Sequence, residues 1–161
     1  MSFPNYNTRI GRCLRAYLNS RICLNPYSAH LLYAANKWES AVEINAKVRN
    51  GIDLILNRYR ASNIAYGSAH QIPIGWLTGL EEGLPDEDLV IILDVSPALS
   101  FKRKNQYRDI HERDRAYLAK VRESYLELAK KFNWHVIDGE KDARTVHSAI
   151  WRLAVPLINK Q

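Results

Sequence analysis

Residues 101–115 carry the densest positive charge in the chain. Three carboxylates lie among the cations of this segment, which are Lys102, Arg103, Lys104, Arg108, Arg113 and Arg115. Guanidinium and ammonium groups at this density can hold the phosphates of a nucleotide, and they can also contact the backbone of a nucleic acid. Either chemistry requires an anionic partner, so this basic segment is a candidate binding region.

A second candidate site follows a short apolar run at residues 53–56, which predicts a buried strand. Asn57 and Arg58 come directly after it. Ligands of parallel α/β sheets bind beyond the carboxyl ends of the strands, so both side chains are expected at a ligand. Arg58 offers a planar fork that fits two phosphate oxygens, and its alternative role is a surface ion pair of little energetic consequence.

Helices and strands alternate along the chain and must position these residues. Thr8 is expected to cap a helix over residues 8–19, and a second helix is expected over 26–49, where Asn50 and Gly51 would end it. Residues 62–80 predict a short helix and a loop. Further helices are expected from Pro97, over 114–132 and over about 143–157.

The remaining apolar runs predict strands at residues 89–95 and 134–137, in addition to 53–56. Strands separated by helices imply right-handed crossovers and a parallel sheet. The fold class is therefore α/β. The length of 161 residues fits a single domain over residues 1–161.

The overall composition is that of a globular protein, with 47% hydrophobic residues and a formal net charge of +6. No apolar run approaches the roughly 18 residues of a membrane helix, and the N-terminus has no signal sequence. Cys13 and Cys23 match neither a zinc pattern nor a redox pair. We therefore expect a cytoplasmic protein without a membrane partner and without a metal held by cysteine.

Several segments resemble motifs of the thymidylate kinase (dTMP kinase) family of P-loop nucleoside monophosphate kinases. Residues 3–6 resemble Phe-Pro-Arg-Tyr, and residues 31–39 resemble Leu-Leu-Phe-x-Ala-Asn-Arg-Trp-Glu. Residues 57–66 resemble Asp-Arg-Tyr-x-x-Ser-x-x-Ala-Tyr, and residues 109–114 resemble the Asp-x-Tyr-Glu-x-Asp that closes the lid. Residues 83–85 and 121–125 also match, in the family's order, so convergence is a poor explanation.

The resemblance implies a three-layer, P-loop kinase-like parallel sheet with helices on both faces. It also implies the reaction ATP + dTMP to ADP + dTDP with Mg²⁺ and ATP as cofactors. The residues that would bind dTMP on this resemblance are Tyr6, Tyr33, Lys37, Arg58, Asn63, Tyr66 and Glu112. In these roles Arg58 contacts the phosphate, Tyr33 stacks on thymine, Asn63 bonds to the base edge, and Tyr66 and Glu112 lie near the sugar.

The catalytic residues implied by the resemblance are Asn57, Arg58, Arg103 and Arg108, and Arg103 and Lys104 would contact the cofactor. The lid, residues 101–115, would supply cations that stabilise the transferring phosphoryl group. Each of these side chains also has an ordinary structural role open to it. Aromatic residues pack in cores, asparagines cap helices and turns, and charged residues form solvated faces.

The sequence departs from the family where ATP would bind. The family begins with a strand, a Gly-x-x-x-x-Gly-Lys-Ser/Thr loop and a helix, whereas none of the seven glycines here precedes a lysine. We expect the N-terminal strands and this Walker A loop to be missing. Asn57 also replaces the family's Asp, Asn5 and Lys37 replace Arg, and His111 replaces Tyr. These replacements remove charge or bidentate contacts.

Three functions follow from these observations. The first is a shortened or split thymidylate kinase, which is active only if the ATP loop comes from elsewhere, such as a separate chain that supplies the P-loop segment. The second is a non-catalytic nucleotide-binding or dimerising relative, with a homodimer through helices to which Leu14, Leu31 and Trp38 would contribute. The third is a basic nucleic-acid-binding module, which explains none of the ordered motifs.

Overall fold

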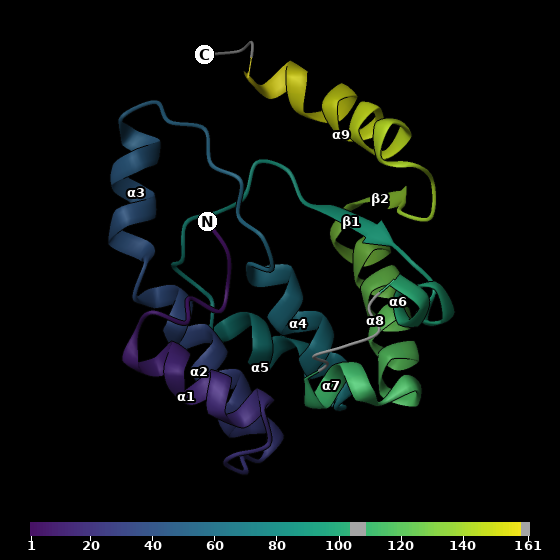
Figure 1. Cartoon of the computed structure of the whole chain (residues 1–161). Coiled ribbons are helices and arrows are strands. Elements are labelled where there is room, and N and C mark those ends of the chain that lie inside the picture. The colour runs from purple at the N-terminus through teal and green to yellow at the C-terminus, as the bar shows by residue number, and fades with distance from the viewer. Residues whose placement is uncertain (104–108, 159–161) are drawn as a thin grey trace.

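The computed structural model describes residues 1–103 and 109–158. Helices dominate these residues, and two short strands form the sheet (Figure 1). In chain order the elements are α1 (Arg9–Leu18), α2 (Pro26–Trp38), α3 (Ala41–Arg49), α4 (Arg60–Ala69), α5 (Ile74–Gly79), β1 (Ile91–Asp94), α6 (Pro97–Arg103), α7 (Ile110–Arg113), α8 (Arg115–Phe132), β2 (His135–Asp138) and α9 (Ala143–Ile158).

Side-chain caps fix the starts of several helices at the positions where the sequence places cap residues. Thr8 Oγ1 accepts from the backbone N–H of Gly11 at 2.9 Å, which confirms the predicted cap of α1. Asn25 caps α2 and Asp114 caps α8 in the same way. Each cap satisfies a backbone donor that has no partner inside the helix.

The single helix expected over residues 26–49 is wrong, because it divides into α2 and α3. The first helix ends at Trp38, and the chain turns through Glu39 and Ser40 before α3 begins. The indole of Trp38 donates to the carbonyl of Leu80 at 3.1 Å, which holds the end of α2 against the segment after α5. This contact is tertiary, so the continuous helical pattern of the sequence does not reveal it.

The two strands pair in parallel, with Ile91 opposite His135 and Asp94 opposite Asp138, which confirms the parallel α/β sheet. The strand expected at residues 53–56 is wrong. Residues 53–56 carry no strand assignment, and the bridge beside them joins Asn57 to Ser2. The N–H of Asn57 donates to Met1 O at 2.9 Å, and the N–H of Phe3 donates to Asn57 O at 3.0 Å. Without a second neighbouring strand, residues 53–56 do not complete a ladder.

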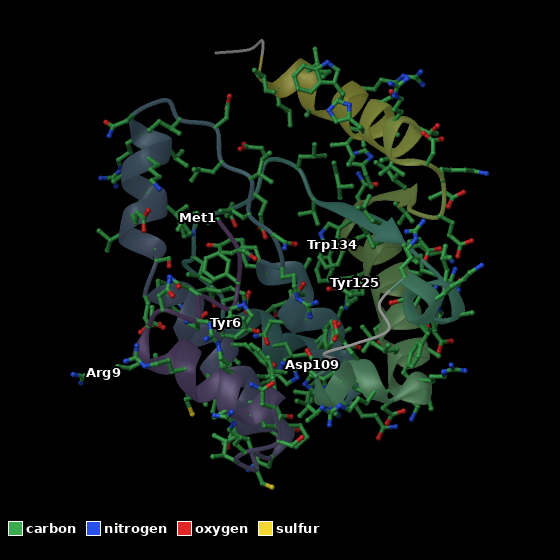
Figure 2. All side chains as sticks on the ribbon, in the orientation of Figure 1. Met1, Tyr6, Arg9, Asp109, Tyr125 and Trp134 are labelled. Atoms are coloured by element: carbon green, nitrogen blue, oxygen red, sulfur yellow. The ribbon has the colours of Figure 1, made fainter. Side chains whose placement is uncertain are left out.

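Three apolar clusters form the core. They centre on Ile44, on Leu77 and Leu128, and on Tyr17 and Leu18. In Figure 2, Tyr6 and Tyr125 lie within the body of the molecule and Arg9 points away from it. Leu14 is completely buried, so our expectation that it contributes to a dimer interface is wrong.

The helix α9 is 16 residues long, and none of its residues is buried. It contacts β2 and lies apart from the helices around α4 (Figure 1). None of the described helices is both long enough and apolar enough to cross a lipid bilayer.

Candidate functional site

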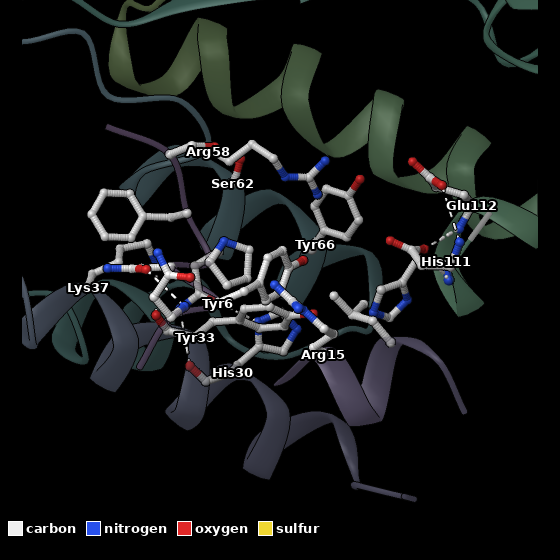
Figure 3. Close-up of a pocket in the computed structure, with 18 residues that line it drawn as sticks. Tyr6, Arg15, His30, Tyr33, Lys37, Arg58, Ser62, Tyr66, His111 and Glu112 are labelled. Carbon is white, nitrogen blue, oxygen red and sulfur yellow. Dashed lines mark hydrogen bonds between the residues drawn. The ribbon is translucent and has the colours of Figure 1, made fainter. Parts of the chain in front are cut away.

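One pocket of about 500 Å³ gathers residues from the N-terminal segment, α1, α2, α4 and α7 (Figure 3). The seven residues implied for dTMP binding all line it, namely Tyr6, Tyr33, Lys37, Arg58, Asn63, Tyr66 and Glu112. They come from four separate parts of the sequence. A pocket of this volume is within the range that small-molecule ligands occupy.

Arg58 occupies a special backbone position at the start of α4. Its φ of 59° lies in the left-handed region, which residues other than glycine, asparagine and aspartate rarely adopt. The guanidinium carbon lies 5.0 Å from the centre of the Tyr66 ring, which holds the charge beside the pocket. A backbone strain of this kind is typical of functional sites, where the surrounding structure keeps a side chain in place.

A second cation, Arg15 of α1, also lines the pocket and lies 4.6 Å from the centre of the Tyr6 ring. Two hydrogen bonds with Asn36 of α2 hold the segment that carries Tyr6. Asn36 Oδ1 accepts from the N–H of Asn5 at 2.7 Å, and Asn36 Nδ2 donates to Thr8 Oγ1 at 3.0 Å. The N-terminal segment is therefore a fixed wall of the pocket.

Four buried polar side chains meet at one end of the pocket. Lys37 Nζ lies 2.6 Å from Glu81 Oε1, and Asn63 Nδ2 donates to the same oxygen at 2.7 Å. Asn63 Oδ1 lies 2.6 Å from His30 Nδ1. Burial raises the pKa of Glu81 and lowers the pKa of Lys37, and their mutual attraction opposes both shifts.

This network changes the part that Asn63 can play. We predict from the sequence that its amide bonds to a base edge as both donor and acceptor. In the structure Asn63 Nδ2 also donates to His30 O at 3.3 Å, so its two hydrogens are directed at protein oxygens. The side chain retains acceptor capacity on Oδ1, which has a second lone pair.

Aromatic rings and imidazoles line the rest of the pocket. The His111 ring lies 5.8 Å from Tyr66 and 5.2 Å from Tyr117, measured between ring centres. Burial lowers the pKa of His111 and the pKa of His30 to about 4, so both imidazoles are neutral near pH 7. Burial raises the pKa of Tyr33, which keeps that phenol neutral.

Glu112 lies at the opposite side of Figure 3 from Lys37. Its carboxylate takes part in a capping box with Asp109, because Glu112 Oε2 accepts from the N–H of Asp109 at 3.2 Å. Burial raises the pKa of the Asp109 carboxyl, which also lines the pocket.

Of the implied catalytic and cofactor residues, Arg58 lines the pocket, whereas Asn57 and Arg103 do not. Asn57 does not line the pocket, and its side chain donates to Ser2 Oγ at 3.3 Å. Arg103 donates to the carbonyls of Gly139 and Glu140 at 2.9 and 3.3 Å, at the turn after β2. Lys104 and Arg108 lie outside the described residues.

Sequence reasoning missed Arg15 and His30 as pocket residues. Arg15 belongs to a helix whose apolar stripe points into the core, and the charge alone does not show that it reaches a ligand. His30 stands one position before the matched motif at 31–39. Its contact with Asn63 crosses 33 positions of sequence, so no local pattern reports it.

The described residues do not form a site for ATP and Mg²⁺. They include no group of three or more histidine, cysteine or acidic side chains that could hold a metal ion. Residues 1–161 contain no Gly-Lys pair that could form a phosphate-binding loop. The described residues therefore include neither a metal-ligand group nor a loop of the kind that holds a nucleoside triphosphate.

The fold compares closely with a solved structure. A thymidylate kinase from Candida albicans superposes with a TM-score of 0.85 at 28% identity, over 99% of this chain and 80% of that one. That enzyme is described as having a broad substrate specificity. The fold is thus that of the P-loop nucleoside monophosphate kinases.

Sequence comparison is more specific than the fold. The thymidylate kinase family model matches residues 1–150. The thymidylate kinase of Danio rerio is 32% identical over 99% of this chain and 76% of its own length, and the human enzyme is 31% identical over 93% and 72%. The chain belongs to the thymidylate kinase family, a family that uses ATP and Mg²⁺ and has dTMP as substrate.

Proposed function

We propose that residues 1–161 bind dTMP and form the phosphate-acceptor part of a thymidylate kinase. The observation that carries this proposal is the single pocket that collects all seven dTMP residues implied by the resemblance. The lining includes Arg58 and Arg15, and together these two guanidinium groups can neutralise the charge of one phosphate. The family relationship supports the same substrate.

Within this pocket the nucleotide would lie with its phosphate at Arg58 and its base at Lys37. The Tyr33 ring stacks on the base, and Tyr66 packs beside the deoxyribose, where an aromatic ring fills the space of a 2′-hydroxyl. Glu112 accepts from a sugar hydroxyl. These residues bind and orient the acceptor oxygen, which is the main contribution that a protein makes to phosphoryl transfer.

The ATP half of the reaction requires a strand, a glycine-rich loop and a helix supplied from outside residues 1–161, by a separate chain or segment. The free edge of β1 supports this part of the proposal. Among the described residues β1 pairs with β2 alone, and Leu93 of β1 is 49% exposed. Ile55, in the segment between α3 and α4, is 87% exposed. Unpaired backbone beside exposed apolar side chains favours the addition of a strand.

A homodimer is a further part of the proposal. Leu31 and Trp38 of α2 are 47% and 42% exposed, and Tyr27 near the start of the same helix is 48% exposed. Large apolar side chains on one helix are suited to an interface with a second copy. Sedimentation at several protein concentrations would measure this association.

The first experiment is calorimetric titration of the chain with dTMP, dUMP, dCMP and UMP, because binding of the monophosphate does not require the ATP loop. We expect micromolar binding of dTMP, lost by roughly 30-fold or more in Arg58→Asn because a charged partner of the phosphate is removed. Asparagine tolerates the left-handed backbone of position 58, so the fold is preserved.

Arg9→Asn removes an equal charge from the exposed face of α1 and should bind as the wild type does. The proposal fails when no monophosphate binds, or when the Arg9 and Arg58 variants lose affinity equally. Binding of dTMP without phosphoryl transfer in the presence of a P-loop segment would favour the non-catalytic relative.

A further inference from the structure

Glu81 holds two pocket residues although it does not line the pocket itself. Its side chain is 1% exposed and lies behind Lys37 and Asn63. Glu81 Oε1 accepts hydrogen bonds from Lys37 Nζ at 2.6 Å and from Asn63 Nδ2 at 2.7 Å. Oε2 is buried and makes no hydrogen bond within the described chain. A buried carboxylate of this kind is costly unless its partners are fixed around it.

The partners of Asn63 determine which way its amide points. Nδ2 faces two oxygens that can only accept, Glu81 Oε1 at 2.7 Å and His30 O at 3.3 Å. Oδ1 faces His30 Nδ1 at 2.6 Å, and this short contact requires a hydrogen on Nδ1 because an amide oxygen cannot donate. The reversed amide would place NH₂ against N–H and oxygen against a carboxylate.

Asn63 and Lys37 each keep some hydrogen-bonding capacity that the protein does not use and that a ligand in the pocket can meet. Asn63 has one lone pair left on Oδ1, so toward a ligand it can only accept. The Lys37 ammonium has three hydrogens, directed in part to Glu81 at 2.6 Å and to Tyr33 O at 3.4 Å, and toward a ligand it can only donate. The pocket therefore presents an acceptor beside a donor.

We propose that Glu81 is a positioning residue that fixes this pattern and thereby selects a pyrimidine with an imide edge. This inference rests on the proposed binding of a nucleoside monophosphate. An imide edge offers N3–H to Asn63 and the 4-carbonyl to Lys37. A 4-aminopyrimidine offers a lone pair at N3 and NH₂ at position 4, so it is mismatched at both contacts. Buried polar groups without partners strongly reject such a ligand.

The test is calorimetric titration of the full chain with dTMP, dCMP and 3-methyl-dTMP, which lacks the N3 hydrogen. We expect the wild type to prefer dTMP by roughly 10- to 100-fold over each of the other two. In Glu81→Met the Asn63 amide loses its closest acceptor and only its contacts with His30 oppose the reversed orientation. We therefore expect the preference for dTMP over dCMP to fall below about 3-fold. Glu81→Gln keeps an oxygen acceptor and should retain the preference.

Glu82→Met is the matched control, because it removes a carboxylate from the exposed neighbouring position. Equal affinity of the wild type for dTMP and dCMP, or for dTMP and 3-methyl-dTMP, overturns the inference but leaves the proposed pocket intact. An unchanged preference in folded Glu81→Met also overturns it. Should that variant fail to fold, the 3-methyl comparison in the wild type decides. A wild type that binds no monophosphate overturns this inference and the proposed function together.

Discussion

His111 of α7 packs against aromatic residues of three other helices. Its ring packs against rings from three other helices, at 5.8 Å from Tyr17 of α1, 5.8 Å from Tyr66 of α4 and 5.2 Å from Tyr117 of α8. The neutral imidazole fits this apolar surface, whereas the charged form would lose its hydration. Nearby Arg58 also disfavours the imidazolium.

The free energy of unfolding should therefore depend on pH through His111. Its pKa is about 4 in the folded state against an ordinary 6.5, so between these values the unfolded chain binds more protons. The contribution is complete above pH 6.5 and is lost as the pH falls toward 4. His111→Tyr removes the titrating imidazole. As the pH falls from 6.5 to 4, the free energy of unfolding of the variant should therefore rise relative to that of the wild type by up to about 1.4 kcal/mol per pH unit.

Urea unfolding of both proteins at pH 7, 6, 5 and 4 measures this difference directly. Carboxyl groups with raised pKa values, such as Glu81, act in the opposite direction but are present in both proteins and cancel in the comparison. A difference that is constant with pH would show that His111 titrates normally in the folded chain.

At the residue scale the resemblance singles out side chains one by one, and the structure brings these side chains together. All seven residues implied for dTMP binding line one pocket. The roles are less predictable than the positions, as Asn63 shows. Its amide donors are directed at Glu81 and His30, and these partners lie 18 and 33 positions away in sequence. No pattern around residue 63 encodes that orientation.

The helix α1 depends on one close approach between elements. Gly11 allows the N-terminal segment to cross the helix, since a Cβ at this position would lie 1.8 Å from Asn5 O and 2.6 Å from Asn5 C. Both atoms belong to the backbone, so the segment itself would have to move. Tyr6 and its contact with Arg15 would move with it.

Gly11→Ala should therefore lower the free energy of unfolding by about 1–3 kcal/mol and weaken dTMP binding. Gly75→Ala is the control, because a Cβ there meets nothing within 4 Å and alanine favours helix by up to about 1 kcal/mol. Urea unfolding and dTMP titration of the two variants measure the two effects. Equal stability of both variants would show that residues 5 and 6 adjust at no cost.

The elements could be predicted where local chemistry defines them. Thr8 caps α1 as the sequence predicts, and the parallel pairing of β1 with β2 follows from the alternation of strands and helices. The predictions of elements are wrong where a contact between residues distant in sequence determines the local structure. The break after Trp38 depends on Leu80, and the state of residues 53–56 depends on which strands lie beside them.

At the scale of the whole molecule, exposed apolar side chains collect around the sheet. Ile52 and Ile55 lie between α3 and α4, Leu93 in β1, Val136 in β2 and Trp151 in α9, and their exposed fractions run from 45% to 87%. These elements occupy the upper half of Figure 1, whereas α1, α2, α4 and α7 lie in the lower half. A surface of this kind is typical of an interface rather than of a solvated face.

The exposed side chain of Ile55 offers the sharpest test of whether that surface receives the P-loop segment. Ile55→Lys should change the free energy of unfolding of residues 1–161 by less than about 0.5 kcal/mol, because the side chain is already 87% exposed. The same charge would be buried beneath an added strand, where an unpaired ammonium costs several kcal/mol. Val42→Lys is the matched control, since Val42 is 82% exposed but lies on α3.

The measurement is dTMP-dependent formation of ADP after co-expression with a strand–Gly-rich-loop–helix segment from a family member. We expect activity with the wild type and with Val42→Lys, and a loss of at least 10-fold with Ile55→Lys, while dTMP binding to all three chains stays equal. Equal activity of the two lysine variants would place the added strand elsewhere. Because the acceptor pocket and the sheet edge are separate parts of the molecule, unchanged dTMP binding together with lost activity is the result that a docked P-loop segment requires.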